Sequence, residues 1–220
     1  MRSTDERDGR SLLIEALTWL YDRVVGDMSH TAPAPGSERD IDRWIRSSCT
    51  QAGAAGFVTN IGGLMTLPIA IPANLAGTTA VQMRLIARIA AARGYDTQSE
   101  EVKTFVFACL LGNAAADVLK DVGLRLGTRV GQRALRLSGP VLSGSVLQRL
   151  NHTIGGRLLA RFGAQGAFSA TKVIPVVSGL IGGGLDAAST RVVGLMAKRV
   201  FPRRPAEPPA TPPPLAIEAG

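Results

Sequence analysis

Few residues in this chain have the types and spacing that catalysis or metal binding requires. Its 220 residues include two histidines, His30 and His152, and two cysteines, Cys49 and Cys109. Two cysteines exclude a disulfide framework and a zinc site built on cysteine. Two isolated histidines leave almost no material for a metal site or an acid–base centre.

The carboxylates and the glycine-rich segments form no recognisable catalytic motif either. Asp117 and Asp121 share a face of a predicted helix but have no third ligand, so we predict no metal site. The motifs of nucleophile elbows, zinc proteases and phosphate loops are absent. Residues 182–184 are glycines before Asp186, but the Lys-Ser/Thr pair of a phosphate loop is missing, so we favour close apolar packing for them. We therefore predict no catalytic residue and no cofactor.

Arginine gives the clearest signal for binding. The formal net charge is +8, and residues 122–185 contain no Asp or Glu. Four arginines recur at steps of four, four and three, on one face of a predicted helix: Arg125, Arg129, Arg133 and Arg136. Glycines recur every four residues on the far side, at positions 123, 127 and 131. We predict that this helix packs through its glycines and presents its arginines to an anionic surface.

Apolar spacing predicts helices along the whole chain, over about 11–25, from 37, 72–93, from 98, 114–137, 146–162 and 186–201. Local signals predict where several of them begin or end. Ser37 with Asp40 and Thr97 with Glu100 resemble capping boxes. Gly94 is a typical C-terminal glycine, and Asp186 is placed to cap the last helix.

Residues 47–83 contain no Asp, Glu, Lys, Arg or His. A run of this length suggests a membrane span, but Gly62, Gly63, Pro68 and Pro72 interrupt it at helix-breaking positions. We favour a short buried helix and a tight connection, with a re-entrant or interfacial segment as the alternative.

These patterns together predict an all-α fold. It is a compact helical bundle with two Gly/Pro-rich apolar elements, about 53–72 and 173–185, at its core. We expect an N-terminal amphipathic helix and linker (1–36), a helical domain (37–201) and a disordered Pro-rich tail (202–220).

Several blocks of the chain resemble the EcsC family, namely 55–72, 82–90, Gly94-Tyr95-Asp96, 102–112 and 173–191. The resemblance covers roughly residues 38–201, with Asn60 as one departure where glycine is expected. It implies structural roles for a set of motif residues: Gly62, Gly63, Pro68, Pro72, Gly94, Tyr95, Asp96, Pro175, Gly182, Gly183, Gly184 and Asp186. It also implies a helical, membrane-associated protein, and it supplies no catalytic residues.

We expect a non-enzymatic protein located in the cytoplasm and peripheral at the inner membrane face, with a re-entrant or integral segment as the alternative. Its expected partner is an anionic membrane surface, bound by the arginine stripe. A lipid or other apolar ligand held between the Gly/Pro elements is the second hypothesis, and a membrane-protein partner is a further one. A hydrolase of unknown type ranks third. Nucleic acid ranks last, because aromatic residues make up only 5% of the chain.

Overall fold

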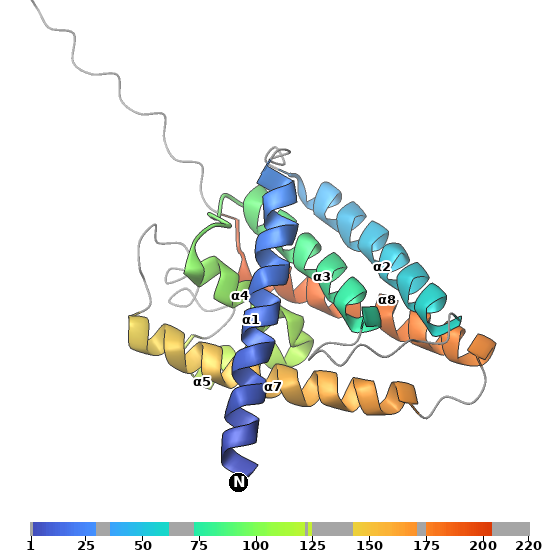
Figure 1. Ribbon diagram of the computed structural model, residues 1–220. Coiled ribbons are helices and arrows are strands. Elements are labelled where there is room, and N and C mark those ends of the chain that lie inside the picture. Colours follow the sequence, from blue (N-terminus) through green and yellow to red (C-terminus); the bar gives the residue numbers. More distant parts are fainter. Residues whose placement is uncertain are drawn as a thin grey trace, which may run out of the picture.

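The computed structural model describes residues 2–29, 36–61, 73–121, 123–124, 143–170 and 175–203, and over these residues the protein is all-α. The helices form a compact bundle (Figure 1). In chain order they are α1 (Arg2–Ser29), α2 (Glu38–Ile61), α3 (Ala73–Ala92), α4 (Glu100–Leu110), the 3-10 turn η1 (Gly112–Ala114), α5 (Ala115–Asp121), α7 (Gly144–Ala170) and α8 (Pro175–Val200).

Helices α2, α3 and α8 pack against one another, and α2 and α8 run antiparallel in close contact. Glycines make this contact possible. A Cβ atom on Gly53 would lie 3.2 Å from the carbonyl oxygen of Gly183, and one on Gly194 would lie 2.9 Å from Cγ1 of Ile45. Because a side chain at these positions would meet α2 or α8, glycine lets the two helix axes approach closely there.

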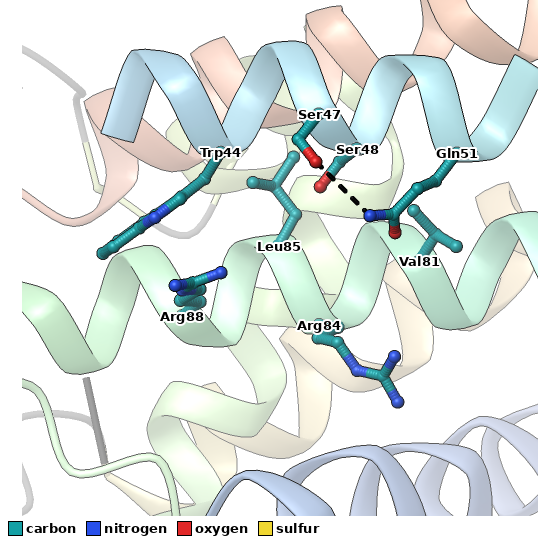
Figure 2. Close-up of a pocket in the computed structure, with 8 residues that line it drawn as sticks. All are labelled: Trp44, Ser47, Ser48, Gln51, Val81, Arg84, Leu85 and Arg88. Atoms are coloured by element: carbon teal, nitrogen blue, oxygen red, sulfur yellow. Dashed lines mark hydrogen bonds between the residues drawn. The ribbon is translucent and has the colours of Figure 1, made fainter. Parts of the chain in front are cut away.

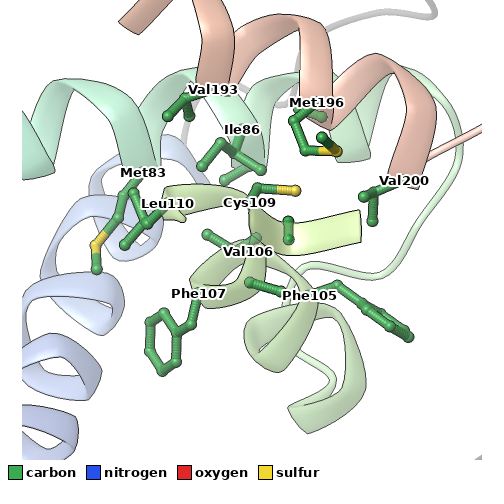
Figure 3. Packing of buried hydrophobic residues seen from close by; sticks show 14 of the residues in the cluster. Met83, Ile86, Phe105, Val106, Phe107, Cys109, Leu110, Val193, Met196 and Val200 are labelled. Atoms are coloured by element: carbon green, nitrogen blue, oxygen red, sulfur yellow. The ribbon is translucent and has the colours of Figure 1, made fainter. Parts of the chain in front are cut away.

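Helix α4 lies at the centre of the hydrophobic core, and every residue from Thr104 to Leu110 is buried. Figure 3 shows its Cys109 beneath Ile86 of α3 and Met196 of α8, and its Leu110 beside Met83 of α3. Burial of each such side chain stabilises the fold by about 1.5–3 kcal/mol relative to an exposed position.

Helix α1 covers this core from the side and packs on α3 and α7 (Figure 1). Leu13, Leu17 and Tyr21 recur at steps of four and are fully buried. The Tyr21 hydroxyl donates a hydrogen bond to the Thr97 carbonyl oxygen at 2.7 Å. Helix α1 is also longer than the predicted 11–25. Through these buried side chains, the N-terminal segment that sequence analysis separated from the helical domain (1–36) contributes to the same core as the rest of the bundle.

Two of the predicted helix ends are confirmed. The Asp40 N–H donates to Ser37 Oγ at 3.2 Å, and the Ser37 N–H donates to the Asp40 carboxylate at 3.1 Å, which is a reciprocal capping box. Gly94 has φ +82° and ends α3, with Tyr95 N–H donating to Ala90 O at 3.0 Å. Such a left-handed residue is favourable for glycine, which has no Cβ atom.

The predicted cap of α4 is wrong by two residues. Ser99, and not Thr97, is the N-cap, because its side chain accepts a hydrogen bond from the Val102 N–H. The preceding Asp96 carboxylate accepts the Gln98 N–H at 2.9 Å, which forms a turn before the helix. Asp96 therefore has a local structural role.

The predicted helix over 114–137 is interrupted after Asp121, and its part from residue 125 onward lies outside the described residues. Helix α5 ends at Asp121, and Gly123 has φ +83° with Leu124 N–H donating to Leu119 O at 2.8 Å. These bonds form a glycine C-terminal cap. A Cβ on Gly123 would have no atom within 4 Å, so this glycine terminates a helix and does not pack against one.

The last predicted helix begins too late. Helix α8 runs unbroken from Pro175, which is its first residue, so Asp186 lies inside the helix and does not cap it. Proline is favourable there because the first helical N–H has no partner within the helix. Gly182 and Gly183 are buried as predicted, but Gly184 is exposed, and a Cβ atom at this position would meet no atom within 4 Å.

Two arginines satisfy carbonyl groups at helix C-termini. The buried Arg93 guanidinium donates to the carbonyl oxygens of Lys198 at 3.0 Å and Phe201 at 2.7 Å, and also pairs with Glu38 at 2.5 Å. Arg161 of α7 donates to the Leu110 carbonyl oxygen at the end of α4. Since the last carbonyls of a helix lack intrahelical donors, these bonds stabilise both ends.

Candidate functional site

The arginine stripe predicted from the sequence, Arg125, Arg129, Arg133 and Arg136, lies outside the described residues. The same is true of Gly62, Gly63, Pro68 and Pro72 in the first Gly/Pro element and of the tail from residue 204 onward. The other motif residues are placed: Gly94, Tyr95, Asp96, Pro175, Gly182, Gly183, Gly184 and Asp186.

The structure brings two of the motif blocks together as the contact between α3 and α8. The Thr78 hydroxyl donates to the Asp186 carboxylate at 3.3 Å, and Gln82 Nε2 donates to Ser189 Oγ at 3.0 Å. Farther along, the Tyr95 hydroxyl donates to the Pro202 carbonyl oxygen at 3.0 Å. Because buried polar groups need partners, these bonds fix how α3 sits against α8. They make Tyr95 and Asp186 structural residues.

The described residues capable of nucleophilic or acid–base chemistry do not form a catalytic group, because they are buried, lie on separate helices or are paired with another residue. Cys109 is fully buried, and burial raises the pKa of its thiol far above the usual range. His152 is exposed on α7, and Asp121 pairs with Arg157 at 3.4 Å. Across the described part of the chain, no three His, Cys, Asp or Glu residues gather as metal ligands would.

The feature with clear binding chemistry is a cationic surface centred on α2. Helices α3 and α8 both pack on α2. Arg84 and Arg88 of α3 line a groove shared with α2, and Arg191 of α8 lies near Cys49 of α2. We call this the α2 basic surface, and its members are Arg39, Arg43, Arg46, Arg84, Arg88, Arg191 and Arg199.

The acidic residues of α2 are already bound to other partners. Glu38 pairs with Arg93 and Lys198, and Asp40 pairs with Arg43 at 3.2 Å. The Lys198 ammonium contacts Asp42 at 2.8 Å, and this hydrogen bond lowers the pKa of the Asp42 carboxyl. Among the described residues, Arg39, Arg46, Arg84, Arg88, Arg191 and Arg199 have no ion pair. Most of the positive charge of the α2 basic surface is therefore not neutralised.

A groove of about 160 Å³ lies within this surface, between α2 and α3 (Figure 2). Its α2 wall is formed by Trp44, Ser47, Ser48 and Gln51, and its α3 wall by Val81, Arg84, Leu85 and Arg88. The groove thus combines two cationic side chains with hydroxyl and amide groups above a partly apolar floor. It is smaller than the roughly 300–1,000 Å³ of pockets that enclose drug-sized ligands, so its size suits a small group.

Arg88 is held in position by Trp44. Its guanidinium carbon lies 4.0 Å from the centroid of the Trp44 ring, which is a cation–π contact. Arg84 lies one helical turn earlier on the same exposed stripe of α3. Two like charges at this spacing destabilise a helix by about 0.2–0.5 kcal/mol, a cost that a bound anion would remove.

Sequence reasoning missed this surface, although a signal for it was present. No Asp or Glu occurs from Arg43 to Tyr95, a stretch that contains Arg46, Arg84 and Arg88. The uncharged run inside the stretch suggested membrane insertion, and the arginines at its two ends were not considered together. These arginines share a surface because α2 and α3 pack side by side.

No family model, curated protein or solved structure matches the chain. Among the helices that the structure describes, none is both long enough and apolar enough to cross a membrane.

Proposed function

We propose that the protein is a non-enzymatic, peripheral membrane protein of the EcsC type that binds the anionic surface of a membrane at its cytoplasmic face. The observation that carries this proposal is the α2 basic surface, in which six exposed arginines lack an acidic partner among the described residues. Each cation near an anionic leaflet contributes about 1 kcal/mol to binding.

Exposed apolar side chains on α8 support the same proposal. Leu185 and Leu195 are 56% and 43% exposed. Leu195 shares one helical stripe with Arg191 and Arg199, at steps of four residues. A helix face that combines leucine with arginine matches the chemistry of an interface between acyl chains and anionic headgroups.

The test is sedimentation of the protein with lipid vesicles. We expect binding to vesicles that contain phosphatidylglycerol, weak binding to pure phosphatidylcholine, and loss of binding as salt rises, because exposed charges are screened beyond about 8 Å at physiological ionic strength. The surface variant Arg39→Gln/Arg191→Gln/Arg199→Gln should bind several-fold more weakly and should melt like the parent, since all three side chains are exposed.

A matched control removes three exposed cations elsewhere, as Arg23→Gln/Lys120→Gln/Arg149→Gln, from α1, α5 and α7. It should retain binding close to that of the parent. Equal losses in the two triple variants would mean that only net charge matters and would refute the assignment to the α2 basic surface. A third variant with Arg125, Arg129, Arg133 and Arg136 changed to Gln measures the contribution of the stripe predicted from the sequence.

A further inference from the structure

We propose that the groove between α2 and α3 is a binding site for a single phosphate group, with Arg84 and Arg88 as its cationic ligands. A phosphate ester can come from a lipid headgroup or from a soluble metabolite, and the chemistry of the groove is the same for both. If the phosphate belongs to a lipid headgroup, the inference rests on the proposed function. The experiments below distinguish a lipid headgroup from a soluble phosphate ester.

The first argument is the preorganisation of Arg88. Its guanidinium lies against the Trp44 ring at 4.0 Å, so one face is covered while the N–H groups remain at the edge of the plane. A guanidinium held in this way can donate two parallel hydrogen bonds to a phosphate. Arg84 lines the same groove one turn earlier on α3 and offers a second cation there, although Figure 2 shows its guanidinium pointing away from α2.

The second argument is the set of polar groups on the opposite wall. Ser47 and Ser48 place two hydroxyl groups on the side of α2 that lines the groove. Gln51 Nε2 donates to Ser47 Oγ at 3.3 Å, so the Ser47 oxygen is the acceptor in this bond and its own O–H can donate to a ligand (Figure 2). Donors from both helices therefore line the same groove.

The third argument is the absence of a competing carboxylate. None of the eight residues that line the groove is acidic, and α3 contains no Asp or Glu. The nearby Asp40 and Asp42 of α2 bind Arg43 and Lys198 instead. Val81 and Leu85 add apolar surface to the groove between these polar groups.

The test for the soluble source uses the full chain with Trp19→Phe, which leaves Trp44 as its single tryptophan. Inorganic phosphate, titrated at constant ionic strength against sodium chloride, should give a saturable change in Trp44 fluorescence. It should also shift the backbone amide signals of residues 44–51 in NMR spectra. Absence of saturable binding by both measurements would overturn the proposal.

Three variants test the assigned ligands. The groove variant Arg84→Gln/Arg88→Gln should abolish saturable binding. The variant Arg84→Lys/Arg88→Lys keeps both charges but loses the planar donors, and should weaken binding about tenfold. The surface variant Arg39→Gln/Arg191→Gln/Arg199→Gln removes exposed charges outside the groove and should leave phosphate affinity within about twofold of the parent. Equal affinity in the lysine variant and the parent, or equal loss in the surface and groove variants, would refute a built phosphate site.

Vesicle sedimentation then identifies the source. If the ligand is a lipid headgroup, the variant Arg84→Lys/Arg88→Lys, which keeps both charges, binds phosphatidylglycerol vesicles more weakly than the parent, and free phosphate competes with the vesicles. If the ligand is soluble, the lysine variant binds phosphate more weakly but binds vesicles like the parent, and free phosphate does not compete with the vesicles; both results support the site. If the parent binds phosphate but no vesicles, the proposed membrane function fails while the phosphate site stands.

Discussion

Replacing two glycines of the same helix with alanine should change stability in opposite directions. Gly184 and Gly194 both lie inside α8, where alanine is favoured over glycine by about 0.5–1 kcal/mol. A Cβ atom on Gly184 meets nothing within 4 Å, so Gly184→Ala should gain this full amount. A Cβ atom on Gly194 would lie 2.9 Å from Ile45 Cγ1 and 3.1 Å from Leu85 Cδ2.

The contact at Gly194 should outweigh the gain in helix propensity. The nearest atom, Ile45 Cγ1, lies in the middle of a buried β-branched side chain, which cannot move away without disturbing α2. Overpacking of this kind costs about 1–3 kcal/mol. We therefore expect Gly194→Ala to lower the free energy of unfolding by about 1–2 kcal/mol, and Gly184→Ala to raise it by about 0.5–1 kcal/mol.

For a chain of this size, each kcal/mol corresponds to a shift in melting temperature of about 2–4 °C. Thermal unfolding followed by circular dichroism should therefore rank the proteins as Gly184→Ala, parent and Gly194→Ala, from the most to the least stable. Gly77→Ala, at an exposed position of α3 that is also open, is a second control and should behave like Gly184→Ala. A Gly194→Ala protein as stable as Gly184→Ala would refute the close packing of α8 on α2 and α3.

Three further predictions test other parts of the structure. Arg93→Met should lower the free energy of unfolding by about 2–4 kcal/mol in urea titrations, because the Lys198 and Phe201 carbonyls lose a buried charged donor; wild-type stability would contradict this role. The hydrogen bond from Lys198 lowers the pKa of the Asp42 carboxyl. The bond therefore stabilises the fold fully above the unfolded-state pKa of about 3.9, and this contribution is lost as the pH falls through the lowered pKa of the folded protein. Melting temperatures of parent and Asp42→Asn should accordingly differ at pH 7 and converge in acid, whereas a difference that persists below the lowered pKa would refute the coupling. Ellman's reagent should detect Cys109 only after unfolding, because the thiol is buried and burial raises its pKa; rapid reaction of both cysteines in the native protein would show that α4 is accessible.

The features that sequence analysis predicted correctly depend on residues close to one another in the chain. The capping box of Ser37 and Asp40 joins residues three apart, and the glycine at 94 ends α3 through bonds within one turn. The buried stripe of Leu13 and Leu17 also follows from helical periodicity alone. Because these interactions are local, the residue types and their spacing are sufficient to predict them.

The errors arose where tertiary packing outweighed local preference. Three consecutive glycines at 182–184 disfavour a helix by about 1 kcal/mol each relative to alanine, which suggested a break before Asp186. Helix α8 continues through them because the close contact at Gly53 and Gly183 lets α2 and α8 bury a long common surface. At Gly123 the error was the reverse, because a helical spacing of small residues was interpreted as packing when one glycine ends the helix.

The sequence by itself determined an all-α protein with a strong excess of arginine. Only the tertiary structure decided which cations share a surface. Arg88 meets Trp44, and Arg191 lies near Cys49, because α3 and α8 pack on either side of α2. Helical periodicity orients side chains about one axis, but the neighbours of each helix are chosen by burial of apolar surface and by glycine contacts between segments far apart in the chain.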